Sequence, residues 1–127
     1  VQRTLPMTQT CMCWGICTSN GWYELIDGLC ASLQWDSERN GYPQVVATQV
    51  KEKFGTLRFY YTFEESKKKY EDRKYGEQEG KIELAEMLSE TICEECGAMK
   101  DVSQTKGWIL TLCDKCLKEY KKKREIK

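Results

Sequence analysis

Residues 93–116 read CEECGAMKDVSQTKGWILTLCDKC and contain two C-x-x-C pairs separated by sixteen residues. This spacing is typical of four cysteines that bind one zinc ion. Four thiolates at about 2.3 Å from the metal complete a tetrahedron and leave no open position, so such a zinc ion would be structural. The predicted ligands are Cys93, Cys96, Cys113 and Cys116. The alternative reading is two disulfides or four loose thiols.

The residues around the cysteines predict a particular order of elements. Gly97 follows Cys96 and permits the positive φ that closes a knuckle turn. Residues 102–104 and 108–112 have the composition of two short strands, joined by a turn at 105–107 that places Gly107 at the strained position. The chain after Cys113 has a helical pattern, and the positive end of a helix dipole favours thiolates. Knuckle, hairpin and helix in this order resemble a treble-clef zinc finger.

Composition restricts the function. The chain of 127 residues has 20 basic and 20 acidic side chains and no histidine. The absence of histidine removes the Ser-His and Cys-His nucleophile systems and the usual general base at neutral pH. Because nothing in the sequence brings carboxylates together either, we expect a protein that is not an enzyme. Free thiols and zinc thiolates imply a reducing compartment, and there is neither a signal-peptide pattern nor an apolar run of membrane-spanning length. We therefore expect a cytoplasmic protein without a membrane partner.

Residues 1–20 form a cysteine-rich N-terminal segment. Its cysteines, together with one in the helix that follows, could supply a second metal site. The four candidate ligands are Cys11, Cys13, Cys17 and Cys30. The alternative is that they are buried thiols, because a free cysteine behaves as a small apolar residue.

Residues 21–92 are predicted to form the core. A helix over 21–35, capped by Asn20, carries an apolar stripe, and Gly28 inside it indicates a close packing contact. The stripe consists of Trp22, Ile26, Leu29, Cys30 and Leu33. Residues 44–63 alternate as a β-hairpin with its turn at Gly55. The helix is expected to cover the hairpin face that carries Leu57, Phe59, Tyr61 and Phe63.

The opposite face of the hairpin carries Arg58 and Tyr60. Because Tyr and Arg dominate many protein interfaces, we interpret these two residues as a candidate partner-binding pair. The alternative is a cross-strand packing pair without a partner.

Residues 64–80 are highly charged and are predicted to be an insertion into the core, either an exposed helix or a flexible excursion, with breaks at Gly76 and Gly80. From Lys81 a second helix leads into Cys93. Its predicted buried face consists of Ile82, Ala85, Leu88 and Ile92. The predicted fold is therefore α+β: a helix packed on a β-hairpin, a second helix, and a C-terminal four-cysteine module at 93–127 that ends in a basic helix.

Four stretches together resemble an uncharacterised family of small proteins of bacteria and their phages. They are GWYELIDGL at 21–29, QVKEKFGTLRFYY at 49–61, CEECG at 93–97 and GWILTLCDKC at 107–116. The resemblance covers about 21–116 without the insertion. Members of this family are short and hypothetical, so the resemblance implies a phage or mobile-element origin and a fold rather than an activity.

Two function classes remain. The first, which we favour, is a zinc-binding protein of a phage or mobile element that binds a host protein, as anti-CRISPR proteins do when they inhibit a host defence system. The second is a nucleic-acid-binding zinc-finger module or regulator, because a lysine-rich terminal helix offers salt-sensitive phosphate contacts. Its candidate residues are Lys118, Lys121, Lys122, Lys123, Arg124 and Lys127. The alternative to the second class is a solvated helix end with no ligand.

Overall fold

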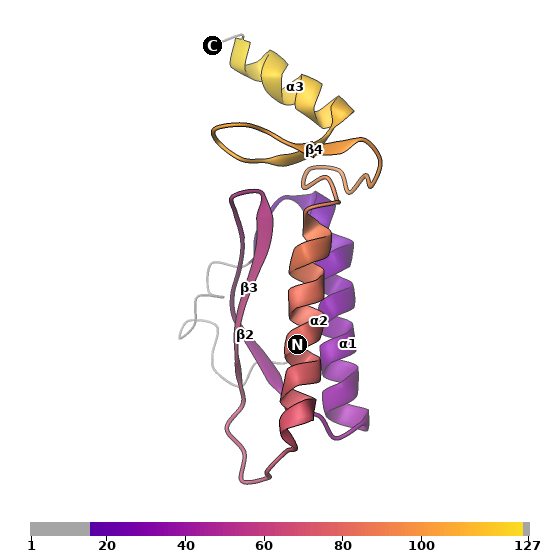
Figure 1. Cartoon of the computed structure of the whole chain (residues 1–127), viewed down its shortest axis with the longest axis vertical. Coiled ribbons are helices and arrows are strands. Elements are labelled where there is room, and N and C mark those ends of the chain that lie inside the picture. The colour runs from indigo at the N-terminus through magenta and orange to yellow at the C-terminus, as the bar shows by residue number, and fades with distance from the viewer. Residues whose placement is uncertain (1–15, 126–127) are drawn as a thin grey trace.

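A computed structural model describes residues 16–125, and its fold is α+β, as predicted. A sheet of three strands packs against two long helices, and a small module with a two-stranded sheet and a third helix sits at one end (Figure 1). The elements are β1 (Ile16–Cys17), the 3₁₀ helix η3 (Asn20–Trp22), α1 (Tyr23–Arg39), β2 (Val45–Lys53), β3 (Thr56–Phe63), α2 (Asp72–Ser89), β4 (Val102–Gln104), β5 (Thr111–Cys113) and α3 (Asp114–Glu125). Within residues 16–125, no helix has both the length and the apolar character needed to cross a bilayer.

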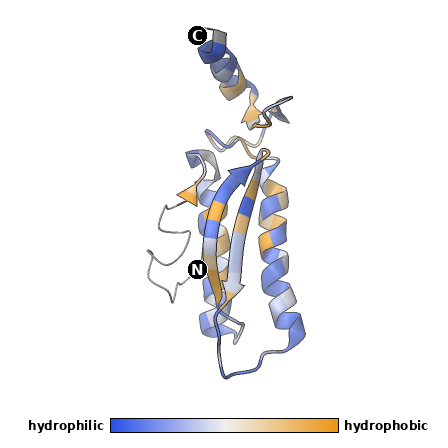
Figure 2. Cartoon of the chain, turned by 90° about the vertical axis from the view of Figure 1, so that its left-hand side faces the viewer, coloured by the Kyte–Doolittle hydropathy of each residue, from blue (hydrophilic) through white to orange (hydrophobic). Residues whose placement is uncertain are grey.

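The β2–β3 hairpin is antiparallel, and its alternation follows the sequence pattern. Val50 lies opposite Phe59, and both are buried against the helices. Arg58 and Lys51 lie opposite each other on the other face, which Figure 2 shows toward the viewer with hydrophilic and hydrophobic residues mixed. One helix was expected to cover the inner face, but α1 and α2 both do so.

Helix α1 differs from its predicted form at its start, its end and its interior. It begins after η3 and reaches Arg39. Neither η3 nor α1 has a side-chain cap, so the prediction of an Asn20 cap was wrong. A Cβ atom on Gly28 would meet nothing within 4 Å, so the close contact predicted there was also wrong. The apolar stripe is confirmed: Trp22, Ile26, Leu29 and Leu33 are buried, and Cys30 is half-buried.

Helix α2 begins at Asp72, inside the stretch predicted as an insertion, and continues through Gly76 and Gly80. The predicted breaks were therefore wrong. Both glycines lie on the exposed side of the helix, where each costs about 1 kcal/mol relative to alanine, and tertiary packing of the other side outweighs this cost.

The buried face of α2 is more polar than predicted. Gln78 and Ser89 are fully buried, whereas Leu88, which was predicted to be buried, is 41% exposed. The Ser89 hydroxyl accepts a hydrogen bond from the Leu57 amide at 2.9 Å, and the Glu86 carboxylate accepts one from the Phe59 amide at 2.9 Å. Polar side chains of α2 therefore accept hydrogen bonds from backbone amides at the free edge of β3. Without them these amides would be unpaired donors.

After α2 the chain forms a knuckle, the β4–β5 hairpin and α3, in the predicted order. Gly97 and Gly107 have φ angles of +83° and +77°, as their predicted turns require. The predicted second strand over 108–112 is shorter and shifted, and it is observed as Thr111–Cys113. We call residues 93–125 the Cys module. Its buried cluster, which consists of Cys93, Leu112 and Cys113, is separate from the main core.

Candidate metal centre and adjoining groove

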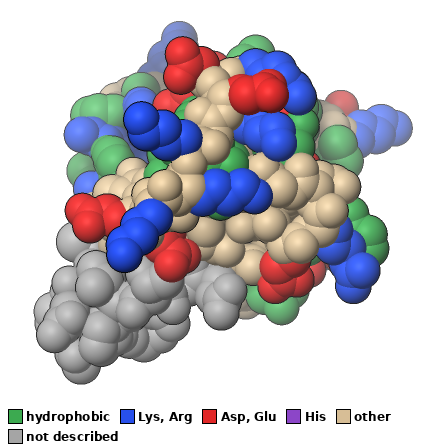
Figure 3. All heavy atoms as spheres, turned by 90° about the horizontal axis from the view of Figure 1, so that it is seen from below, with side chains coloured by type: hydrophobic (Ala, Val, Ile, Leu, Met, Phe, Trp, Pro, Cys, Tyr) green, Lys and Arg blue, Asp and Glu red, His purple; other side chains and the backbone are tan. Residues whose placement is uncertain are grey.

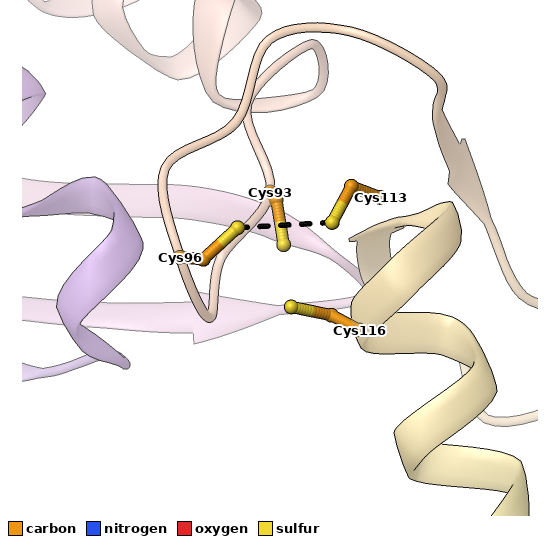
Figure 4. Close-up of side chains that lie close together, drawn as sticks. All are labelled: Cys93, Cys96, Cys113 and Cys116. Atoms are coloured by element: carbon orange, nitrogen blue, oxygen red, sulfur yellow. Dashed lines mark hydrogen bonds between the residues drawn. The ribbon is translucent and has the colours of Figure 1, made fainter.

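The side chains of Cys93, Cys96, Cys113 and Cys116 point toward one another (Figure 4). All four sulfur atoms lie within 4.8 Å of one another, and the Cys96 and Cys113 sulfurs are 3.7 Å apart. A tetrahedron with metal–sulfur bonds of about 2.3 Å has sulfurs about 3.8 Å apart. A disulfide bond is far shorter, at about 2.05 Å. The geometry therefore fits four thiolates around a single metal ion.

Local backbone geometry positions both pairs. The Cys93 amide donates to the Ala98 carbonyl at 2.8 Å, and the Gly97 amide donates to the Cys93 carbonyl at 2.8 Å, which folds the first pair into a tight loop. Cys113 ends β5 directly opposite Val102, and Cys116 follows in the first turn of α3. Each pair is thus set by a short local segment, which is why the spacing in the sequence predicts it.

The electrostatics of the four thiols favour a cation. Burial opposes ionisation of Cys93, but the backbone N–H groups of Cys113, Cys96 and Glu95 point at its sulfur and lower its pKa to about 7. Burial and hydrogen bonds from the neighbouring thiols raise the pKa of Cys116. One thiolate therefore forms readily while a neighbour resists ionisation, and a divalent cation would favour the ionised form of all four.

The second predicted metal site stays a prediction. Cys11 and Cys13 lie outside the described residues, Cys17 lies in β1, and Cys30 lies in α1, where burial raises the pKa of its thiol. In the chain from residue 16 to residue 125, one cluster brings three or more metal-ligating side chains together, and it is the cluster of the four cysteines in the Cys module.

The Cys module and Ile92, the residue directly before it, dock on η3, ahead of α1. The Gly21 amide donates to the Glu94 carbonyl at 2.6 Å, and the Trp22 indole donates to the Ile92 carbonyl at 2.9 Å. A Cβ atom on Gly21 would lie 2.1 Å from the Cys93 carbonyl oxygen, so only glycine fits there. The sequence did not predict this contact, because the residues around Gly21 do not show that the backbone of a segment far along the chain packs against them.

A second contact joins the Cys module to the β2–β3 turn. The buried Thr111 hydroxyl donates to the Gly55 carbonyl at 2.6 Å, and the Glu94 amide donates to the Thr111 carbonyl at 3.0 Å. Glu94 is only 7% exposed, and burial raises the pKa of its carboxyl group, which accepts a hydrogen bond from the Ser19 amide at 3.1 Å. These polar contacts fix the Cys module relative to the core.

A groove of about 530 Å³ lies between the β4–β5 loop and α3, and we call it the basic groove. Its lining contains three cations and two aromatic rings and no carboxylate. The lining residues are Gln104, Thr105, Lys106, Trp108, Leu117, Tyr120, Lys121 and Arg124. By contrast, Figure 3 shows basic and acidic side chains interspersed at the end of the molecule opposite the Cys module.

Both walls of the basic groove are held by hydrogen bonds. The Thr105 hydroxyl donates to the Trp108 carbonyl at 2.5 Å and accepts from the Leu110 amide at 2.8 Å. On α3, the Arg124 guanidinium donates to the Tyr120 hydroxyl at 2.7 Å. The backbone that carries Trp108 is thus fixed, although the Trp108 side chain is 74% exposed.

The structure divides the basic residues that the sequence grouped together. Lys121 and Arg124 line the basic groove, whereas Lys123 lines a different hollow beside Glu94, Glu95 and Glu119. Lys118 and Lys122 are exposed and line neither hollow, and Lys127 lies outside the described residues. The groove residues Lys106 and Trp108 were missed, because the turn at 105–107 was interpreted only for its conformation and Trp108 only as part of a strand.

Arg58 and Tyr60 lie on the open face of the hairpin, as predicted from the alternation. Tyr60 is 42% exposed, and the Lys51 ammonium lies 5.8 Å from the centre of its ring. Arg58 is half-buried, and its Nε atom is buried without a hydrogen-bond partner.

Comparisons of the chain with models of protein families, with curated proteins and with solved structures found no match. The resemblance to a family of bacterial and phage proteins therefore stays a prediction, and the functional argument rests on the residues themselves.

Proposed function

We propose that this chain is a non-enzymatic, cytoplasmic binding protein in which one structural zinc ion supports a nucleic-acid-binding groove. The observation that carries the proposal is the basic groove, which combines Lys106, Lys121 and Arg124 with an exposed tryptophan and has no carboxylate in its lining.

Zinc is the metal that the donor set supports best. Four thiolates with sulfurs about one tetrahedral edge apart are typical of closed structural zinc sites. The treble-clef order of knuckle, hairpin and helix agrees with this assignment. Zinc thiolates persist in a reducing compartment, which supports a cytoplasmic location.

Nucleic acid is the ligand that the basic groove supports best. Lysine and arginine neutralise phosphates, and exposed aromatic rings stack on bases. A protein partner would also suit an aromatic groove, but it would need an acidic surface to match three cations without a carboxylate, whereas every strand of nucleic acid carries phosphates. This is why we rank nucleic acid above the protein partner that we favoured from the sequence.

The first prediction tests the charge of the basic groove. A Lys106→Gln, Lys121→Gln, Arg124→Gln variant should bind a single-stranded oligonucleotide roughly 50-fold more weakly at about 0.15 M salt. The reason is that each phosphate contact releases about 0.7 counterion on binding, and the variant loses three such contacts. The slope of log affinity against log salt should fall by about 2. Fluorescence anisotropy over a salt series measures both.

The matched control removes the same charge outside the basic groove. A Lys118→Gln, Lys122→Gln, Lys123→Gln variant should bind within about threefold of the unmodified chain. Equal losses of affinity in the two variants would show that binding depends on net charge rather than on the basic groove. No binding by the unmodified chain would refute the proposed function.

A second candidate function, binding of a host protein by a phage or mobile-element protein that inhibits a host defence, is favoured by the open face of the hairpin. Tyr60 is exposed there, and the buried Arg58 Nε atom lacks the hydrogen-bond partner that buried polar groups usually have. The Arg58 side chain as a whole is only half-buried, so a partner on this face can contact it together with Tyr60.

The second prediction tests this candidate. If the open face binds a host protein, an Arg58→Ala, Tyr60→Ala variant should lose at least about 30-fold in affinity, since residues of this kind often contribute 2 kcal/mol or more. Co-purification from bacterial cells with and without nuclease, followed by mass spectrometry, measures the loss. A partner captured equally by both chains, or one lost after nuclease treatment, would contradict this candidate.

A further inference from the structure

We infer that the basic groove takes a single strand of nucleic acid, with an unpaired base stacked on Trp108 and its phosphates on Lys106, Lys121 and Arg124. This inference rests on the proposed function and specifies its ligand. The basic groove suits RNA and DNA equally, because the inferred contacts are to bases and phosphates and not to the sugar.

Trp108 stands between two hollows. It lines the basic groove on one side, and on the other side it lines a hollow of about 200 Å³. The second hollow is lined by Glu52, Lys53, Phe54, Gly107, Trp108 and Ile109. An indole in this position, 74% exposed, can offer its ring to a base. In a duplex the bases are stacked on one another, so a protruding aromatic ring selects unpaired bases.

Phe54 supplies a second exposed ring beside the first. It is 64% exposed, and its φ angle of +55° lies in the left-handed region, which bulky side chains rarely adopt. Neither burial nor turn geometry explains a phenylalanine at this position, since the turn favours glycine or asparagine. An exposed ring kept at a strained position indicates a contact outside the chain.

The backbone segments that carry the two rings are in contact. The Thr111 hydroxyl donates to the Gly55 carbonyl at 2.6 Å, and a Cβ atom on Gly55 would lie 2.9 Å from the Ile109 side chain. The turn that carries Phe54 therefore contacts the strand and loop that carry Trp108. The carboxylate of Glu52 in this hollow is engaged, because it accepts a hydrogen bond from the Gly55 amide at 2.7 Å.

Cations lie on both sides of Trp108. Lys106, Lys121 and Arg124 line the basic groove, and the Lys53 ammonium lies 5.6 Å from the centre of the Phe54 ring. Alternating aromatic rings and cations are the pattern by which single strands are bound without sequence preference. The path runs from the basic groove across Trp108 to Phe54.

The test uses four labelled probes of equal length: oligo-dT, oligo-U, an abasic strand with the same number of phosphates, and a duplex. The unmodified chain should bind oligo-dT or oligo-U at least about tenfold more tightly than the abasic strand, because each base stacked on an aromatic ring adds about that much. Trp108→Ala should remove most of this preference, leaving only the part that Phe54 supplies, and should leave the salt dependence on the abasic strand unchanged, whereas Trp108→Phe should keep most of the preference.

The matched control is Trp35→Ala. Trp35 is also an exposed tryptophan, at 56%, with the Arg39 guanidinium 4.2 Å from its ring centre, but it lies on α1 and lines neither hollow. This variant should bind all four probes as the unmodified chain does.

The outcomes separate the two proposals. Tighter binding of oligo-dT or oligo-U than of the abasic strand and the duplex supports the inference. Equal binding of all four probes, with no effect of Trp108→Ala, would overturn the inference and leave the proposed function intact. No binding of any probe would overturn both.

Discussion

Removal of the metal should abolish hydrogen-exchange protection in the knuckle, β4, β5 and α3, while β2, β3, α1 and α2 keep most of theirs. The reason is that the Cys module has almost no apolar core of its own: two of the three residues in its buried hydrophobic cluster are the ligands Cys93 and Cys113. Structural zinc contributes on the order of 10–16 kcal/mol in small fingers, far more than burial of Leu112 can replace.

The main core should survive because it is formed by a separate cluster. Trp22, Leu33, Leu57 and Ile82 are each at most 2% exposed and come from η3, α1, β3 and α2. Some loosening is expected at η3, where the Trp22 indole donates to the carbonyl of Ile92, the residue directly before the Cys module.

Hydrogen exchange with mass spectrometry, with and without a chelator, measures this effect. Cys116→Ser should reproduce the effect of the chelator without one, whereas Cys17→Ser, an exposed cysteine in β1, should not. Uniform loss of protection across the described chain would show that the Cys module and the core are a single cooperative unit. Unchanged protection would show that no metal supports the module.

The second large effect is expected from Gly21→Ala. The new methyl carbon would lie 2.1 Å from the Cys93 carbonyl oxygen and 2.4 Å from the Glu94 carbonyl oxygen, and neither backbone can move without breaking the knuckle. Overpacking together with the lost Gly21–Glu94 hydrogen bond should cost about 3–5 kcal/mol. The Tm should fall by roughly 10–20 °C in a chain of this size.

Gly28→Ala is the matched control on the neighbouring helix. Nothing lies within 4 Å of a Cβ atom at this position, so the substitution should raise the free energy of unfolding by about 0.5–1 kcal/mol through helix propensity alone. Differential scanning calorimetry of both variants gives the comparison. A Gly21→Ala chain as stable as the unmodified chain would show that the Cys module does not dock on η3 as described.

The parts of this fold that the sequence predicted are those set by local spacing. The two C-x-x-C pairs predicted the four-cysteine cluster, because each pair is built within one short turn. The hairpin faces followed from simple alternation, which put Phe59 inside and Tyr60 outside.

The parts of the fold that the sequence could not predict depend on contacts between segments far apart in the chain. Ser89 is buried instead of Leu88 because its hydroxyl accepts from the Leu57 amide, a pairing across thirty-two positions. Gly21 is required by the backbone of Cys93 and Glu94, which no local pattern indicates. Lys121 and Lys123 are two positions apart in sequence, but the helical turn of α3 places Lys121 in the basic groove and Lys123 in a hollow with three glutamates.

The metal content of the chain tests the central claim most directly. Native mass spectrometry and elemental analysis of protein purified without added metal should find one zinc ion per chain, and Cys116→Ser should lose it. A chain without metal in which Cys93, Cys96, Cys113 and Cys116 form two disulfides would contradict the account.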